Sequence, residues 1–228
     1  MEYKYELHCH SSMVSKCGKT SPEEICKIYK EQGYSGIVIT EHYNPHTFIY
    51  SNIFAPQKSM KHFLSSYYEI KKYESEDFSV MLGIELRHHL SASDYLIYGV
   101  TPEWLLKQGN MLNWWEKKRY EEVNKAGFLV FQAHPFRQGK ICNPKYVDGI
   151  EVFNGKANDI QNQKALDWAR EHGKMFSSGS DFHKFGSCRL GGIITEAKIT
   201  NNEELISVLK SGKYNLIAPG EREKTNDV

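Results

Sequence analysis

The chain lacks the segments that mark membrane-spanning and secreted proteins. No stretch approaches the roughly 18 consecutive apolar residues of a membrane span, and the start of the sequence has no apolar signal region. The five cysteines are an odd number and contain no Cys-x-x-Cys pair, which argues against a disulfide framework or a zinc ribbon. We therefore expect a cytoplasmic protein with reduced thiols and no membrane contact.

Charge of one sign is not concentrated anywhere in the chain. The formal net charge is +1, and Lys and Arg are spread along the sequence, so we expect no strong footprint for duplex nucleic acid. The chain also has no Gly-x-Ser-x-Gly nucleophile elbow, no phosphate-cradling Gly-x-x-x-x-Gly-Lys-Ser/Thr loop, no internal repeat and no low-complexity segment. The function must come from other residues.

Short apolar runs recur along the chain, and each ends at side chains that can bind a metal or a polar ligand. The period of two along a strand sends His8 and His10 to the same side. The runs, each with its terminal polar residues, are 3–7 with His8 and His10, 36–40 with Glu41 and His42, 78–84 with Glu85, 128–133 with His134, 149–153 with Asn154, and 175–178 with Asp181 and His183.

Helical patterns lie between these runs. Ser21 and Glu24 form a capping box with Pro22 at the first helical position, and Gly33 closes that helix. Further helices are expected over residues 59–73, 102–126, 158–171 and 202–211. The aromatic-rich stretch 43–68 is irregular at first, and two interpretations stay open: a lid over the metals, or a plain surface loop with a few buried rings. We expect one domain over residues 1–219 and a frayed polar tail over 220–228.

A single histidine at the end of a strand is usually a surface or hydrogen-bonded core residue. The combination of these residues is stronger evidence for a shared site than any one of them. It consists of a His-x-His on the first strand, an Asp-x-His on the last, and a carboxylate or imidazole after three strands between them. In α/β barrels the carboxyl ends of the strands meet at one mouth, so these groups would converge there. The pattern predicts a polynuclear metal site.

In this order, the motifs resemble the PHP (polymerase and histidinol phosphatase) family over about residues 3–215. The segments that carry the resemblance are His8-Cys9-His10, Thr40-Glu41-His42, Gly83-Ile84-Glu85, Ala133-His134-Pro135, residues 149–155 and residues 179–183. The resemblance implies an α/β fold, a distorted (β/α)7 TIM-like barrel with its metal site at the C-terminal ends of the strands. It also implies two or three divalent ions, Zn, Mn, Fe or Mg, and hydrolysis of phosphate esters.

The resemblance also assigns ligands. One metal would be held by His8, His10, Glu85 and Asp181, with Glu85 bridging to a second metal that is held also by His134. His42 and His183 would belong to a third.

Two positions depart from the family pattern. Asp94 occupies the place of a second-metal histidine in many members, and a carboxylate there favours Mn, Mg or Fe. The third-metal ligand that usually comes after the first motif, an Asp or His, is missing from residues 11–17. Two alternatives remain: Cys17 replaces it as a thiolate, or Cys17 is a small hydrophobe and the enzyme holds two metals, with Lys16 lending positive charge at the third position.

The leading hypothesis is a phosphoesterase in which metal-bound hydroxide attacks a phosphomonoester or phosphodiester of a small metabolite or nucleotide. If the third metal is absent, His183 or His42 would donate a proton to the leaving group. The alternatives are a nuclease or oligonucleotide-trimming exonuclease, a phosphotyrosine-protein phosphatase, and a non-catalytic metal-binding regulatory module. The sequence indicates no oligomeric state.

Substrate-binding residues are harder to select. Arg137 and Arg189 come shortly after His134 and His183, and each is either a grip for a phosphate or carboxylate of the substrate or an exposed surface arginine. We expect no site role for several other side chains. Arg87, His88 and His89 are expected to be exposed in a loop, and Trp114 and Trp115 to pack in the core. His46, His62 and His172 are expected to have structural roles.

Overall fold

One curved sheet organises residues 1–48 and 56–219, which the computed structural model describes. Within these residues the strands run in the order β10-β9-β1-β2-β4-β5-β6-β7-β8, and β3 pairs with β4 beside this path. The strands are β1 (Tyr3–Cys9), β2 (Gly36–Ile39), β3 (His42–Tyr43), β4 (Ser79–Arg87), β5 (Asp94–Tyr98), β6 (Leu129–Gln132), β7 (Gly149–Asn154), β8 (Met175–Gly179), β9 (Gly192–Thr195) and β10 (Asn215–Ile217).

The sheet nearly closes into a barrel because the first strand meets the last of the main set. The backbone N–H of His10 donates to the carbonyl of Phe182 (2.9 Å), and the N–H of Phe182 donates to the carbonyl of His8 (3.1 Å). These bonds join the end of β1 to the segment just after β8. The expected barrel is confirmed, and its main distortion is β5, which runs antiparallel to both β4 and β6.

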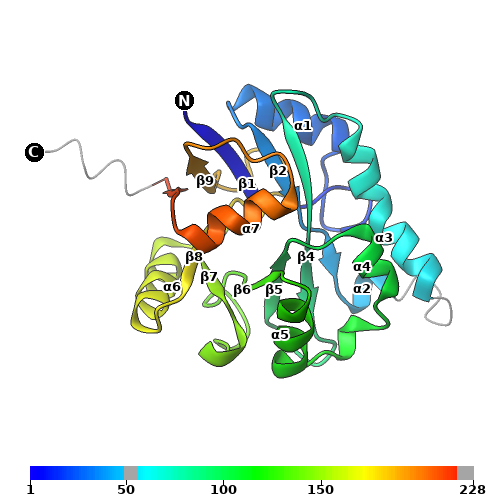
Figure 1. Cartoon of the computed structure of the whole chain (residues 1–228), viewed down its shortest axis with the longest axis vertical. Helices are drawn as coiled ribbons and strands as arrows, with labels where there is room; N and C mark the ends of the chain where they lie inside the picture. The colour runs from blue at the N-terminus through cyan, green and yellow to red at the C-terminus, as the bar shows by residue number, and fades with distance from the viewer. Residues whose placement is uncertain (49–55, 220–228) are drawn as a thin grey trace, which may run out of the picture.

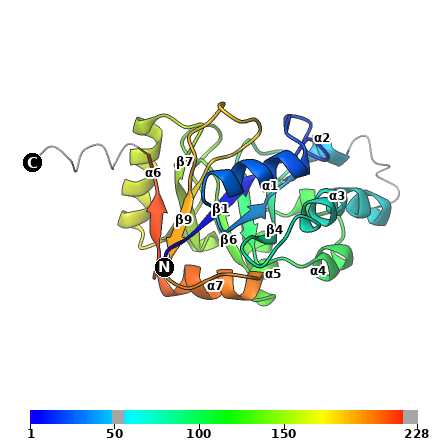
Figure 2. The same cartoon turned by 90° about the horizontal axis from the view of Figure 1, so that it is seen from above.

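Helices surround this sheet, with α6 and α3 on opposite flanks in both views (Figures 1 and 2). They are α1 (Pro22–Glu31), α2 (Pro45–Phe48), α3 (Pro56–Lys71), α4 (Pro102–Lys107), α5 (Glu116–Lys125), α6 (Asp159–Glu171) and α7 (Asn202–Ser211). In the part of the chain described, no helix is both long and apolar enough to cross a membrane.

The predicted start of α1 is confirmed. The Ser21 hydroxyl accepts from the Glu24 backbone N–H (3.3 Å), and the Glu24 carboxylate accepts from the Ser21 backbone N–H (3.0 Å), which is a complete capping box.

The single helix predicted over residues 102–126 is wrong. The chain forms α4, a short 3-10 turn (Met111–Asn113) and α5 instead. Gly109 disfavours a helix, and the Asn110 side chain accepts from the backbone N–H of Leu112 (2.9 Å), which starts the turn. Trp114 is buried as expected, but Trp115 is 58% exposed, so core packing is wrong for the second tryptophan.

The irregular stretch predicted from residue 43 is shorter than expected, because α3 already begins at Pro56. The two open interpretations, a lid or a surface loop with a few buried rings, concern residues 43–68. Tyr43 and Phe63 of this stretch are buried, and residues 49–55 lie outside the described residues. The expected frayed tail, residues 220–228, lies outside them as well.

The barrel interior is apolar towards one end. Tyr5, Val38, Met81 and Phe131 pack there with Leu205 of α7, so this helix covers the apolar end (Figure 1). Along β4, side chains two residues apart share a face, which places Glu85 on the side of Met81 but nearer the opposite end. Polar groups therefore gather at the end that α7 leaves uncovered.

Gly179, the last residue of β8, lies at a close approach between β1 and β8. A Cβ there would lie 2.4 Å from the Cβ of His8 and 2.7 Å from Oε1 of Glu151. We expect Gly179→Ala to lower the free energy of unfolding in urea by about 1–3 kcal/mol, as overpacking does. Gly109→Ala is the matched control, because no atom lies within 4 Å of its added Cβ. Equal losses in both variants would contradict a close-packed seam.

Candidate metal centre

Five side chains from distant parts of the chain meet at the uncovered end of the barrel. Each is at least 97% buried. They are His8 on β1, His10 just after it, Glu85 on β4, His134 after β6 and Asp181 after β8.

Glu85 lies at the centre of this group. Its Oε1 is 2.9 Å from Nε2 of His134 and 3.4 Å from Nε2 of His8, and its Oε2 is 3.5 Å from Nε2 of His10. Asp181 faces the same atoms: its Oδ1 is 3.5 Å from Nε2 of His10 and 3.8 Å from Nε2 of His8. The structure thus brings together the residues that the sequence pattern selected for the first two metals.

Several atoms of this group have no hydrogen-bond partner within the described residues. They include Nε2 of His8, Nε2 of His10, Oε2 of Glu85 and Oδ1 of Asp181. Buried polar atoms without partners are costly, and imidazole nitrogens facing carboxylate oxygens are the donor set of Zn, Mn or Fe sites. These residues fit a divalent cation, and they are the four expected to share the first metal.

The backbone at two of these residues is unusual. His134 has φ of 30° and Asp181 has φ of 51°, and they are the two non-glycine residues with positive φ in the described chain. Non-glycine residues in this region are strained unless their surroundings hold them. Both strained positions carry candidate ligands, which indicates that side-chain placement outweighs backbone preference here.

Glu151 on β7 supports the group from behind. Its Oε1 is 2.8 Å from Nδ1 of His8, and its Oε2 accepts from the backbone N–H of His134 (2.9 Å). A carboxylate on one nitrogen of a histidine orients the other nitrogen towards a metal. Sequence reasoning treated Glu151 as part of a strand, although a carboxylate within an apolar run was a usable signal.

Two further buried carboxylates shape the loops around the ligands. Glu41 accepts from the backbone N–H groups of Ser11 (3.0 Å) and Ser15 (3.1 Å), which folds the segment after His10. Glu6 accepts from the backbone N–H groups of His8 (2.7 Å) and Ser180 (2.9 Å). Burial raises the pKa of Glu6 to about 7, against the lowering effect of these hydrogen bonds. The sequence pattern marked Glu41 as a polar residue at the end of a strand but gave it no role, and it did not select Glu6.

Asp94 reaches the group through the antiparallel β5. Its position at the start of that strand places it at the same end as the carboxyl ends of the others, with Oδ2 3.8 Å from Nε2 of His134. Both its oxygens also accept from Arg87, through Nε (2.6 Å) and Nη2.

The expected loop exposure is therefore wrong for Arg87, and also for His88, which is 2% exposed. β4 continues to Arg87 to pair with β5 instead of ending before Glu85.

A second group lies beside the first, made of His42, His183 and Cys17. Sγ of Cys17 is 3.1 Å from Nε2 of His42 and 2.9 Å from Nε2 of His183. Burial raises the pKa of the Cys17 thiol, but the hydrogen bonds of the two imidazoles outweigh it and lower the pKa to about 6. Nδ1 of His42 contacts Oε2 of Glu85, so the two groups are continuous. Lys16 lies next to Cys17 and is exposed.

Two cations border the centre. Nη1 of Arg137 contacts Oδ2 of Asp181, and Nζ of Lys156 is 3.6 Å from Oδ1 of Asp181 and 2.5 Å from Nδ1 of His183. Lys156 was missed by sequence reasoning, because it comes two residues after β7 and matched no ligand pattern. Arg189 is not brought here, since its guanidinium donates to Asp159 (2.5 Å) and to the carbonyl of Ala157 (2.7 Å).

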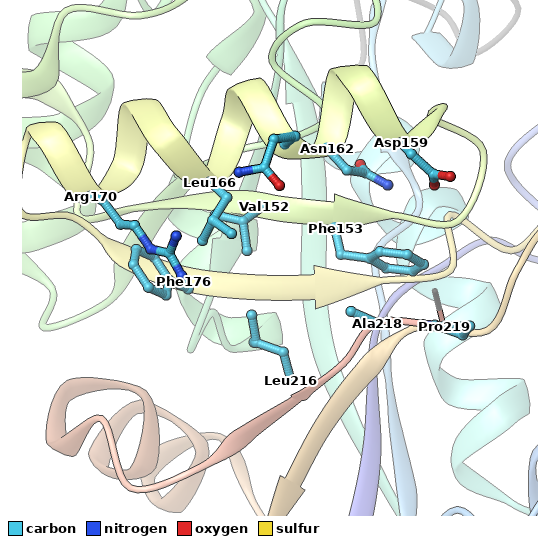
Figure 3. A pocket seen from close by; sticks show the side chains of 11 residues that line it. Val152, Phe153, Asp159, Asn162, Leu166, Arg170, Phe176, Leu216, Ala218 and Pro219 are labelled. Carbon is cyan, nitrogen blue, oxygen red and sulfur yellow. The ribbon is translucent and has the colours of Figure 1, made fainter. Parts of the chain in front are cut away.

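An apolar pocket of about 270 Å³ lies elsewhere, between α6, β7, β8 and β10 (Figure 3). Val152, Leu166, Phe176 and Leu216 form much of its wall, with Arg170 at one side (Figure 3). None of the candidate ligands lines it, so it is separate from the metal centre.

The family comparison agrees with the geometry. The model of the PHP domain matches residues 6–177, and a second one, described as PHP-associated, matches residues 159–214. The chain belongs to the PHP domain family. No curated protein shows significant sequence similarity to it.

Solved structures share the fold of this PHP domain at low sequence identity. PsfC from Pseudomonas syringae aligns with a TM-score of 0.70 and 15% identity over 96% of this chain and 93% of its own. A two-domain protein from Bacteroides vulgatus that contains a predicted PHP-like metal-dependent phosphoesterase aligns with a TM-score of 0.67 and 17% identity. The alignment covers 96% of this chain and 65% of that protein. An amidohydrolase from Chromobacterium violaceum, with bound sulfate and no metal, aligns with a TM-score of 0.55 and 14% identity over 96% of this chain and 99% of its own.

The role of Glu151 behind His8 can be tested by metal titration against a competing chelator. We expect Glu151→Gln to weaken binding of Mn²⁺ or Zn²⁺ to the PHP domain by about 10–100-fold, the usual effect of losing an outer carboxylate. Glu121→Gln is the control, because that carboxylate is 60% exposed on α5. Unchanged affinity in Glu151→Gln would show that His8 needs no orienting partner.

Cys17 is expected to be the most reactive thiol of the metal-free protein. Burial raises the pKa of the other four cysteines, whereas Cys17 has a pKa of about 6 and is thiolate at neutral pH. Its alkylation rate by iodoacetamide, measured by mass spectrometry, should rise through pH 6 and level off above it. His183→Ala should move this midpoint upwards, towards the ordinary thiol value of 9.0. A midpoint already near that value in the wild type would contradict the imidazole contacts.

Proposed function

We propose that this PHP domain is a metal-dependent phosphoesterase that hydrolyses a phosphomonoester or phosphodiester of a small metabolite or nucleotide. The observation that carries the proposal is the buried meeting of His8, His10, Glu85 and Asp181, whose unpartnered nitrogen and oxygen atoms face one another. An inactive scaffold would have no need of so complete a donor set at such a cost in burial.

The first metal would be held by His8, His10, Glu85 and Asp181. The second would be held by Glu85, His134 and Asp94, whose ligand atoms all lie within 4.8 Å of one another. Two divalent ions polarise phosphoryl oxygens, lower the pKa of water and stabilise a leaving alkoxide, so no covalent nucleophile is required of the chain. The chain's own contribution is to orient these groups through Glu151 and to exclude bulk water by burial.

A third metal would be held by His42, His183 and the thiolate of Cys17. The low pKa of Cys17 favours this assignment, because a thiolate is the form that binds metals. His10 also lies close, with a ring centroid 4.1 Å from that of His42 and 4.4 Å from that of His183. In this arrangement the two histidines act as ligands, and their alternative role as proton donors applies when the third metal is absent.

Arg137 and Lys156 would hold the non-bridging oxygens of the phosphoryl group. Both lie at Asp181, on the border of the ligand group, and their side chains keep 24% and 26% exposure towards solvent. A guanidinium and an ammonium offer charge-assisted hydrogen bonds to phosphate oxygens. The even spread of charge elsewhere favours a small substrate over long nucleic acid.

The test is turnover by metal-reconstituted protein, with elemental analysis of the same sample. We expect at least two divalent ions per chain and hydrolysis of p-nitrophenyl phosphate or bis-p-nitrophenyl phosphate. Asp181→Asn should lower kcat/KM by about a thousandfold, since several kcal/mol of charge stabilisation depend on the metals. Arg137→Met should lower it by about ten- to a hundredfold, the loss of a charged hydrogen bond, without a change in metal content.

Arg170→Gln serves as the control, since this exposed arginine on α6 lines the separate apolar pocket. Single-stranded DNA and a phosphotyrosine peptide, assayed in parallel, identify the alternative activities. Fewer than two bound ions under saturating supply, together with no hydrolysis of any of these esters, would refute the proposal and leave a metal-binding module.

A further inference from the structure

A further pocket lies on the outer side of the barrel, where the β4–β5 hairpin meets α5. It has a volume of about 740 Å³. The register of the hairpin explains its place: Asp94 faces inwards to the metal centre, so the next residue, Tyr95, faces outwards. The pocket is lined by His88 and Tyr95 of the hairpin, by Lys140, and by four residues of the α5 region: Trp115, Glu116, Lys117 and Arg119.

Arg119 is the unusual member of this wall. It is 1% exposed, its guanidinium carbon lies 3.2 Å from the centroid of the Tyr95 ring, and no carboxylate of the described residues lies within ion-pair distance. Its Nε and Nη2 atoms have no hydrogen-bond partner there. The aromatic ring covers one face of the guanidinium but accepts no hydrogen bond from these two atoms. Buried donors without acceptors are costly, so a group that accepts from them would bind favourably.

The two unpartnered atoms form one edge of the guanidinium. Arg87 lies on the inner face of the β4–β5 hairpin. It uses the corresponding edge of its own guanidinium, Nε and Nη2, to bind both oxygens of Asp94. Parallel N–H groups of this kind match two oxygens of a carboxylate or a phosphate. The edge of Arg119 is thus a site for an oxyanion that the chain itself does not fill.

His88 adds a third donor. Its Nδ1 accepts from the backbone N–H of Leu90 (3.1 Å), which leaves the ring proton on Nε2, and Nε2 has no partner within the described residues. His88 is as buried as the arginine, and the two interact electrostatically. Three N–H donors on two buried side chains are therefore without acceptors at this pocket.

The charges of the wall select among oxyanions. Lys117, Lys140 and Arg119 line the pocket with one carboxylate, Glu116, which already accepts from the hydroxyl of Tyr95 (3.0 Å). Lys117 also lies 3.8 Å from the exposed carboxylate of Glu121, so Arg119 and Lys140 carry most of the excess positive charge. A phosphoryl group carries up to two negative charges and more acceptor oxygens than a carboxylate, so it matches this excess of cations better. We propose that the pocket of His88, Trp115 and Arg119 binds the phosphate group of a small ligand, at a site distinct from the metal centre.

Trp115 is expected to move when the ligand binds. Its ring stacks on that of His88, with centroids 3.8 Å apart, although it is 58% exposed. Nε2 of His88 and the edge of Arg119 have almost no contact with solvent, so an anion reaches them when the indole leaves the imidazole. Displacement of Trp115 makes binding visible as a change in tryptophan fluorescence.

The experiment is titration of the full-length, metal-loaded protein with inorganic phosphate, with acetate as the carboxylate probe and ionic strength held by chloride. We expect a saturable fluorescence change with phosphate and a weaker one with acetate. Arg119→Lys keeps the charge but removes the two-pronged edge, and His88→Asn keeps an acceptor for Leu90 but removes the Nε2 donor. Each should weaken phosphate binding by about tenfold or more.

Three controls separate this site from its surroundings. Trp115→Phe should lose the fluorescence change but retain binding by calorimetry. Arg137→Gln, at the metal centre, and Arg170→Gln, on α6, should leave the fluorescence titration unchanged. Urea unfolding checks that each variant is folded, and His88→Asn provides the test if Arg119→Lys is not.

Wild-type affinity in both His88→Asn and Arg119→Lys, loss of the signal in Arg137→Gln, or tighter binding of acetate than of phosphate would overturn the inference. These measurements involve no turnover, so their outcome does not depend on the proposed phosphoesterase activity.

Discussion

The rest of the centre depends on the electrostatic interaction between the buried carboxylate of Glu85 and the imidazoles around it. Burial alone would raise its pKa, but the imidazoles of His42 and His8 outweigh this and hold the pKa well below the ordinary value. The reverse holds for His8, where burial lowers the pKa and Glu151, Asp181 and Glu85 together raise it. Each charge is stable in the interior because the opposite charges are already there, so the group must form as a unit.

This requirement joins the site to the closure of the barrel. Glu6 links β1 to Ser180 after β8, and Glu151 links β7 to His8 on β1, so the same hydrogen bonds close the seam and aim the imidazoles. Gly179 lets the two strands approach at this point. Such a seam holds the ligand positions together, which suits a centre whose ligands come from segments far apart in the sequence.

The β4–β5 hairpin uses its two faces for different purposes. Glu85 and Asp94 face the metal centre, while Tyr95 and His88 face the outer pocket. The alternation of side chains along a strand makes this possible within a few residues. Because β5 is antiparallel to its neighbours, Asp94 begins a strand and still lies at the ligand end. A regular parallel barrel would place the start of this strand at the opposite end.

The sequence by itself determined six of the ten strands of the described residues, most helices and the candidate ligands that follow those strands, because short apolar runs that end in His, Asp or Glu are local signals. It did not predict β3, β5, β9 or β10, and Asp94 was selected only through the family resemblance. It also contained the capping box of Ser21 and Glu24. The tertiary structure decided the contacts between residues far apart in the sequence. Cys17 contacts His42 and His183, Lys156 contacts His183, and Arg189 pairs with Asp159 away from the metal centre. It also decided that Glu151 lies against His8 and that Arg119 is buried without a carboxylate partner, since no local pattern records which side chains from separate strands will meet.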